Sequence, residues 1–220
     1  TVLMDVDGAY MNLEIMVNNE LVGMHPNGYI PYQADITRAL RFDGRKNKLK
    51  LITQSRQPSS RWYSGGGLYR DVCLWMGNPI HVKPWDLFVT TPEVTEDYAL
   101  IQVEEEQEIQ VECSILDEKG TIVVQVEKMR KLCGKQKEIF QLTVNNPQLW
   151  DLDTPYLYTC RMVLKKQGEV QDVTEDTFGI RTIEVDVENG FRLNGRKMNL
   201  KGGCVHHDNG FLGACAYPKA

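Results

Sequence analysis

The stretch that decides the fold contains four short runs: IQVEC (109–113), TIVVQV (121–126), EIFQLTV (138–144) and PYLYTCRMVL (155–164). Each run alternates apolar with polar residues or is rich in β-branched and aromatic ones, which is typical of a strand with a buried face. The runs follow one another at roughly the 8 to 12 residue spacing of an immunoglobulin-like sandwich. This stretch therefore predicts an antiparallel β-sandwich.

Strand-like runs continue on both sides of this stretch. They are VLMDV (2–6), LEIMV (13–17), KLKLIT (48–53), YRDVCLW (69–75) and RTIEVDV (181–187). The residue pairs between the runs tolerate a positive φ and favour hairpin turns. These pairs are Asn18-Asn19, Asn27-Gly28, Lys119-Gly120, Gln167-Gly168 and Asn194-Gly195. The sequence predicts an all-β chain.

Helical spacing is confined to two short segments, DITRALRF (35–42) and EKMRKLCGKQKE (127–138). A parallel α/β sheet needs a helix between successive strands, so the chain does not contain a complete (β/α)₈ barrel. Pro79 and Pro84 bracket a predicted boundary between two sets of strands.

Charge and composition argue against two classes of function, nucleic-acid binding and membrane insertion. The 220 residues include 25 Lys and Arg and 30 Asp and Glu, giving a formal net charge of −5. No basic stripe is present to contact a phosphate backbone, and no run approaches the roughly 18 apolar residues of a membrane helix. We expect neither a nucleic acid nor a membrane as partner. The chain opens on a strand rather than a signal segment, so we expect it to begin within a longer protein.

The six cysteines are widely spaced and show no zinc-type pattern, so we expect reduced, buried thiols and no metal in this chain. Reduced thiols favour the cytoplasm, although the sequence leaves localisation and oligomeric state open.

A first candidate binding site is the loop around Ser60, Arg61 and Trp62, which precedes three glycines. It lacks the Lys-Ser/Thr pair of a phosphate loop. An aromatic ring and an Arg on a turn suit a sugar, which stacks on rings and accepts directional hydrogen bonds. A tight loop that packs on a neighbouring domain explains the same residues, and spacing does not decide between them.

A second candidate is the group His206, His207 and Asp208, which follows a predicted strand. Neighbouring strand residues point to opposite faces, so both histidines cannot ligate one metal unless the backbone turns. Polar side chains at the carboxyl end of a strand instead suit a barrel-enzyme pocket. A polar surface turn is the competing interpretation.

The chain resembles glycoside hydrolase family 2, and within it the bacterial β-galactosidases. The resemblance rests on segments that occur in the family's order. They are residues 7–37, SSRWYSGGGLYRDV (59–72), NPQLWDLDTPYLYT (146–159) with TFGIRTIEV (177–185), and GFRLNGRKMNLKGGCVHHDNGFLGA (190–214).

The resemblance implies three parts: the C-terminal part of a jelly-roll sugar-binding domain (1–84), an immunoglobulin-like sandwich (85–184) and the start of a truncated (β/α)₈ barrel (185–220). In such enzymes two barrel glutamates carry out a retaining double displacement. Both would lie beyond Ala220, so no catalytic residue is assigned here and the chain alone is expected to be inactive. Family metal sites use mostly downstream ligands, so a divalent metal is left to the full enzyme.

What the resemblance does assign to this chain is the edge of the substrate pocket. His206 is the first choice for a sugar contact, with His207, Asp208, Ser60, Arg61 and Trp62 at the rim. The implied partners are a β-galactoside or related carbohydrate and the missing barrel of the same protein. Two alternatives stay open: a stand-alone carbohydrate-binding module, and a β-glucuronidase or β-mannosidase of the same family.

Overall fold

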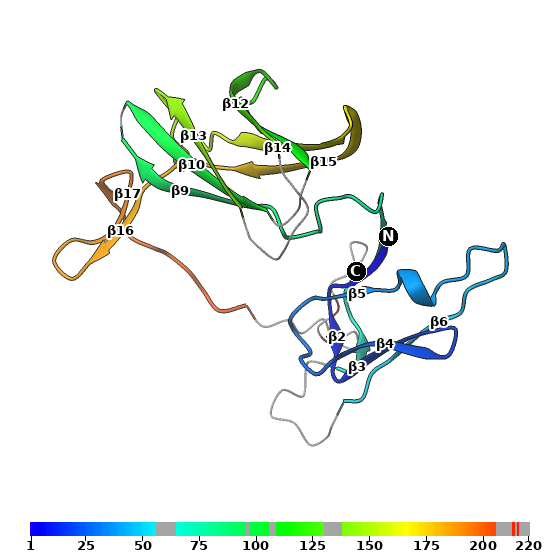
Figure 1. The fold of residues 1–220 in the computed structure, drawn as a ribbon. Coiled ribbons are helices and arrows are strands. Elements are labelled where there is room, and N and C mark those ends of the chain that lie inside the picture. The colour runs from blue at the N-terminus through cyan, green and yellow to red at the C-terminus, as the bar shows by residue number, and fades with distance from the viewer. Residues whose placement is uncertain are drawn as a thin grey trace. The chain divides into compact units, whose positions relative to one another are not determined.

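The computed structural model describes residues 1–55, 65–95, 97–105, 109–129, 138–205, 213 and 215. The chain divides into two compact units (Figure 1): the first unit comprises Thr1–Gly77 with Gly203–Ala220, and the second unit Asn78–Gly202. Strands dominate both, and the helical content of the described residues is one 3-10 turn. The predicted all-β fold class is confirmed.

The second unit is a sandwich of two antiparallel sheets (Figure 1). One sheet has the strand order β13-β10-β9 and the other β12-β11-β14-β15. The strands are β9 (Phe88–Val94), β10 (Tyr98–Glu105), β11 (Gln110–Leu116), β12 (Ile122–Lys128), β13 (Glu138–Asn145), β14 (Tyr158–Lys166) and β15 (Glu169–Phe178). Three strands facing four in this order give the Greek-key arrangement of an immunoglobulin-like sandwich.

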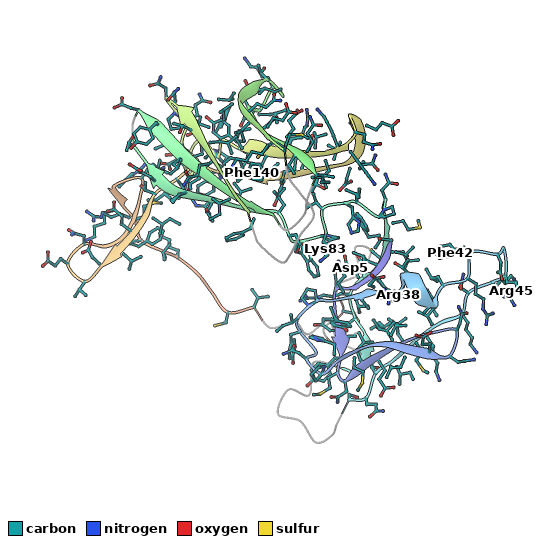
Figure 2. The ribbon with its side chains drawn as sticks, viewed as in Figure 1. Asp5, Arg38, Phe42, Arg45, Lys83 and Phe140 are labelled. Atoms are coloured by element: carbon teal, nitrogen blue, oxygen red, sulfur yellow. The ribbon has the colours of Figure 1, made fainter. Side chains whose placement is uncertain are left out.

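The alternation read from the sequence explains this sandwich. Alternate residues of strands β10, β11, β13 and β14 are buried between the sheets, as a two-residue period requires. These residues are Ala99, Ile101, Val111, Cys113, Ile115, Phe140, Leu142, Val144, Tyr158, Cys160, Met162 and Leu164. Phe140 lies inside the sandwich (Figure 2) and is among the largest fully buried side chains.

Residues 78–82, at the start of the second unit, are hydrogen-bonded to strand β15. The side chain of Asn78 donates to the carbonyl oxygen of Gln171 over 2.7 Å, and Val82 N donates to the carboxylate of Asp172 over 2.9 Å. Val82 itself is buried in the sandwich core.

The first unit also stacks two small sheets, β5-β1-β8 and β4-β3-β6, with a two-stranded ladder of β2 and β7 beside them. Its strands are β1 (Val2–Val6), β2 (Ala9–Tyr10), β3 (Leu13–Val17), β4 (Glu20–His25), β5 (Tyr32–Asp35), β6 (Leu49–Ile52), β7 (Gly67–Leu68) and β8 (Val72–Met76). The core between the sheets comes from β1, β3 and β5 together with Ile36.

Three predicted turns form two-residue hairpin loops. They are Asn18-Asn19, Gln167-Gly168 and Asn194-Gly195, in which both residues have a positive φ. This conformation matches the right-handed twist of the flanking strands. Gly28 is different, because the space that a side chain would need is filled by the ring of Tyr10.

Neither of the two segments with helical spacing forms an α-helix in its described residues. Of DITRALRF, only Thr37–Ala39 makes a turn, η1, because Ile36 is buried in the core and the Thr37 hydroxyl accepts from Val2 N over 2.8 Å. These contacts with β1 hold the segment against the sheet and override its helix propensity. Of the second segment, Glu127 and Lys128 lie in strand β12, and residues 130–137 lie outside the described residues.

A small sheet, β16-β17-β18, follows the sandwich, with strands Ile183–Asp186, Gly190–Leu193 and Arg196–Lys197. It contains the predicted Asn194-Gly195 hairpin. The resemblance matches KGGCVHHD (201–208) to a first barrel strand, and its described residues, 201–205, are not in a strand. The domain limits at 84 and 184 stay predictions.

Burial of the thiols was predicted correctly for Cys113 and Cys160, whose sulfur atoms lie 3.9 Å apart in the second core. For Cys73 and Cys204 the prediction is wrong, because both thiols are exposed. Cys73 pairs with Asp5, on the face of the sheet opposite to the core residues Val2, Met4 and Val6. None of these four thiols forms a disulfide. In the described parts of the chain, no helix is long and apolar enough to cross a membrane.

We expect Phe140→Ala to lower the free energy of unfolding of the second unit by about 3–5 kcal/mol, because the truncation leaves a cavity in a close-packed core. Val170→Ala is the matched control: Val170 is exposed on β15, and its truncation should cost no more than about 0.5 kcal/mol. Urea denaturation followed by circular dichroism measures both. Equal losses in the two variants would contradict the placement of Phe140 in the core.

Candidate functional site

The site residues predicted from sequence all lie outside the described residues. They are Ser60, Arg61, Trp62, His206, His207 and Asp208. Their roles therefore stay predictions. The structure does describe most of the segments that carry the family resemblance, and it brings three of them together around Trp150.

Trp150 belongs to NPQLWDLDTPYLYT and is held by main-chain contacts. Its N–H donates to the carbonyl oxygen of Ile180 over 2.8 Å, and its carbonyl oxygen accepts the Asn194 side-chain amide over 3.0 Å. Ile180 comes from TFGIRTIEV and is fully buried in the sandwich core. Asn194 comes from the third segment, at the hairpin turn. Trp150 thus connects the sandwich with the hairpin that follows it.

Asn194 makes two further hydrogen bonds that fix the hairpin. Its N–H donates to the carbonyl oxygen of Thr182, and its side-chain oxygen accepts from Thr182 N, each over 3.0 Å. An Asn is suited to this position, because it tolerates the positive φ of the turn and offers both an acceptor and donors.

Gly179 permits the close approach of the sandwich to Trp150. A Cβ atom at Gly179 would lie 2.7 Å from the Cβ of Trp150 and 2.8 Å from the ring carbon Cγ. Such distances are well inside van der Waals contact, so any side chain here would displace the indole. On the ring itself lies the guanidinium of Arg181, 4.9 Å from the centroid, in a cation–π contact.

The hairpin carries its own ion pairs. An Arg192 guanidinium nitrogen lies 2.6 Å from the Glu184 carboxylate and 3.2 Å from that of Asp186. The Asn189 N–H donates to Asp186 and holds the pKa of that carboxyl below its usual value, and Arg192 acts in the same direction. The two carboxylates are therefore engaged in holding the hairpin.

Between the hairpin and the Trp150 loop lies a cavity of about 690 Å³, here called the Trp150 groove. Its walls are mainly apolar side chains, with two cations and one amide. The lining residues are Trp150, Leu152, Arg181, Ile183, Phe191, Leu193, Met198, Asn199, Leu200 and Lys201. Leu152, Ile183 and Leu200 are exposed. A contiguous exposed apolar surface of this kind is typical of an interaction or ligand-binding site.

The described lining of the groove offers no pair of groups for glycoside chemistry. Retaining hydrolysis needs two carboxylates that flank the scissile bond, and none of the described lining residues is Asp or Glu. A second, more polar depression contains Asp117 and Glu118. There the Asp117 carboxylate accepts from Lys119 N and Thr121 N and so forms the β11–β12 turn. Within the described ranges, no three His, Cys, Asp or Glu side chains gather into a possible metal site.

Sequence reasoning did not identify this groove. The sequence analysis assigns no site role to Trp150, Arg181, Phe191 or Met198. The available signal was the set of three quoted segments, 146–159, 177–185 and 190–214, because each of them contributes residues that line the groove.

Comparison with known proteins places the chain in a family. A model of glycosyl hydrolases family 2 matches residues 80–181, which covers most of the sandwich. The β-galactosidase BoGH2A of Bacteroides ovatus is 38% identical over 98% of this chain, which spans 27% of that protein. A putative β-glucuronidase of Formosa agariphila is 32% identical over 97% of the chain, which spans 21% of it.

Solved structures agree with these matches. A glycosyl hydrolase family 2 member from Bacteroides cellulosilyticus superposes with a TM-score of 0.89 at 38% identity, over 98% of this chain and 31% of that one. A β-glucuronidase from Bacteroides uniformis superposes with a TM-score of 0.85 at 27% identity, over 99% of this chain and 29% of its own. The chain spans about a fifth to a third of the length of these relatives, and it belongs to glycosyl hydrolase family 2.

Proposed function

We propose that this chain is a non-catalytic part of a retaining glycoside hydrolase that acts on terminal β-galactosides. The observation that carries the proposal is the match to the B. ovatus β-galactosidase along almost the whole chain. The higher identity to this protein than to the β-glucuronidases favours a galactoside as the substrate.

In this proposal residues 1–84 are the latter part of a jelly-roll domain, 85–184 an immunoglobulin-like domain, and 185–220 the start of the catalytic barrel. The two glutamates that perform the displacement belong to the barrel beyond Ala220. His206, His207 and Asp208, with Ser60, Arg61 and Trp62, contribute the pocket edge, where they would donate and accept hydrogen bonds with sugar hydroxyls.

The Trp150 groove gives this chain a second task, which is to support the catalytic barrel. Its apolar floor is suited to a packed protein contact, and Arg181 and Lys201 favour acidic groups on the part that covers it. A stand-alone carbohydrate-binding module is the alternative. Such a module would have no part to seat on the groove.

The pocket edge can be tested in chimeras. This chain replaces the matched stretch either of the B. ovatus β-galactosidase or of the B. uniformis β-glucuronidase, and kcat/KM is measured with each host's nitrophenyl glycoside. We expect the isolated chain to be inactive, the galactosidase chimera to keep activity within about tenfold of its parent, and the glucuronidase chimera to lose about 100-fold through misplaced contacts.

In the galactosidase chimera, His206→Ala should lower kcat/KM by about 10- to 100-fold, the effect of losing a hydrogen bond to substrate. Val170→Ala is the control and should not change it. Turnover by the repurified isolated chain would contradict the proposal, as would equal activity of the two chimeras or an unchanged His206→Ala variant.

The supporting role makes a separate prediction about Leu200, which is 75% exposed on the groove. In the isolated chain, Leu200→Asp should change the free energy of unfolding by no more than about 0.5 kcal/mol. In the galactosidase chimera the new carboxylate would be buried without a partner, which costs about 1–3 kcal/mol or more. We therefore expect a lower melting temperature of the chimera.

Val187→Asp is the matched control. Val187 is fully exposed in the turn between β16 and β17 and is not among the residues that line the groove. It should leave both proteins unchanged. If the two aspartate variants melt alike in the chimera, the groove does not seat the catalytic part.

A further inference from the structure

Residues 38–50, which run from η1 into β6, carry a local excess of positive charge and are here called the basic loop. They include six Lys or Arg and one Asp, a net charge of +5, in a chain whose formal net charge is −5. The six cations are Arg38, Arg41, Arg45, Lys46, Lys48 and Lys50. The acidic total of the chain hides this excess, so the expected lack of a basic stripe does not hold for this segment.

The basic loop presents its side chains to solvent. Arg38 and every residue from 41 to 50 are exposed, and Figure 2 shows Phe42 and Arg45 on the part that extends beyond η1. The Phe42 side chain is 74% exposed. The Arg45 guanidinium lies 2.5 Å from the Asp43 carboxylate. Within the described residues, the other five cations form no ion pair with a carboxylate, so their charge is available to an anion from outside the chain.

Two asparagine side chains hold the base of the basic loop. The Asn47 side chain donates to the carbonyl oxygen of Arg41 over 2.9 Å and accepts from Arg41 N over 2.8 Å. The Asn18 side chain donates to the Asn47 side-chain oxygen and to the Ala39 carbonyl oxygen, each over 2.8 Å. It also accepts from Lys48 N over 3.1 Å. Because these bonds fix the loop backbone before a ligand arrives, binding incurs a smaller loss of conformational entropy.

The cations follow one another along the chain. Lys50 pairs with Met16, whose neighbours in β3 are buried in the core, so the Lys50 side chain lies on the opposite face of the sheet. Lys48 precedes Lys50 by two residues, which is about 6–7 Å in an extended chain. Cations spaced in this way can contact successive charges of a linear polymer, whereas a small anion reaches fewer of them.

We propose that the basic loop binds an acidic polysaccharide, with its cations on the carboxylate or sulfate groups and the Phe42 ring on a sugar face. Guanidinium groups bind such oxyanions through paired hydrogen bonds, and runs rich in Lys and Arg are typical of surfaces that bind heparin or nucleic acids. The exposed ring adds an apolar contact with the C–H face of a sugar. No catalytic group is involved, so the proposal does not rest on the galactoside proposed above as the substrate.

Two observations favour a polysaccharide over a nucleic acid. Proteins that bind single strands without sequence preference stack successive bases on several aromatic side chains, and Phe42 is the single aromatic residue of the basic loop. The chain also belongs to a family of glycosyl hydrolases, whose substrates are glycosides. A polysaccharide bound to the basic loop would hold the protein close to glycosidic bonds.

Fluorescence anisotropy of a labelled heparin oligosaccharide tests the proposal, and this readout is independent of turnover. We expect this chain to bind heparin with a Kd on the order of 10 μM in about 50 mM NaCl. In about 200 mM NaCl binding should be at least about tenfold weaker, because salt screens the cations. Desulfated heparin should bind more weakly and neutral dextran not at all. Absence of heparin binding at low salt, or equal binding of dextran, would overturn the proposal.

Competition with other polyanions identifies the class of ligand. Single-stranded DNA and vesicles that contain phosphatidylserine compete with the labelled heparin, and we expect each to bind more weakly than heparin does. Equal or tighter binding of the DNA would assign the basic loop to a nucleic acid and overturn the proposal. Equal or tighter binding of the vesicles would assign it to a membrane surface, with the same consequence.

Two triple variants with equal loss of charge locate the binding surface. One neutralises three cations of the basic loop, by Arg41→Gln, Arg45→Gln and Lys46→Gln. The matched control neutralises three exposed lysines elsewhere, by Lys119→Gln, Lys166→Gln and Lys197→Gln. We expect heparin binding to weaken at least about tenfold in the first variant and less than about twofold in the control. Both should melt like the parent, because all six positions are exposed. Equal weakening in the two variants would overturn the assignment to the basic loop.

Phe42→Ala separates the sugar contact from the charge, because it leaves every cation in place. We expect heparin to bind about 3- to 10-fold more weakly to this variant, the effect of losing an aromatic contact. The control is Tyr29→Ala, which removes an exposed ring of the same unit outside the basic loop and should leave the Kd unchanged. An unchanged Kd for Phe42→Ala would overturn the stacking of a sugar on its ring.

Discussion

The hydrogen bond from Trp150 N to Ile180 O connects the sandwich core with the loop and the hairpin that form the Trp150 groove. Ile180 is fixed because its side chain is buried in the sandwich core, so the bond transfers that rigidity to the Trp150 loop. The loop in turn receives the Asn194 amide, which orients the hairpin. Gly179 is a consequence of this constraint, since the indole occupies the space of its missing side chain. The sandwich core thereby fixes the position of the Trp150 groove, which lies outside that core.

The sequence predicts the parts of the fold that depend only on residues close together along the chain. Runs such as LEIMV and IQVEC alternate because one face of the strand is buried, and that period is visible without any structure. The Asn194-Gly195 turn is equally local, since two residues with positive φ suffice to make it. DITRALRF was misread because its outcome depends on a distant contact, between Thr37 and Val2. Helix propensity is a weak prior against such a contact.

The groove was beyond sequence reasoning for the same reason. Trp150, Arg181 and Phe191 are separated along the chain, and each alone resembles an ordinary core or surface residue. Only the β-sandwich and its hairpin bring them to one cavity. The exposure of Cys73 was also unpredictable from its run, YRDVCLW. That run looks buried on both faces, but Cys73 lies on the face of β8 opposite to the core, and the run alone does not indicate which of its faces is covered.

Exposed apolar surface is where the second unit is suited to a contact with another part of a protein. Scattered apolar residues are normal on a protein surface, but those of the Trp150 groove gather around one cavity. This arrangement supports the proposal that the catalytic part of the same protein packs on the groove, since the chain spans only part of its relatives' length. In the proposed hydrolase the sandwich and its hairpin would then act as a preformed frame, because their core and hydrogen bonds fix the groove before anything packs on it.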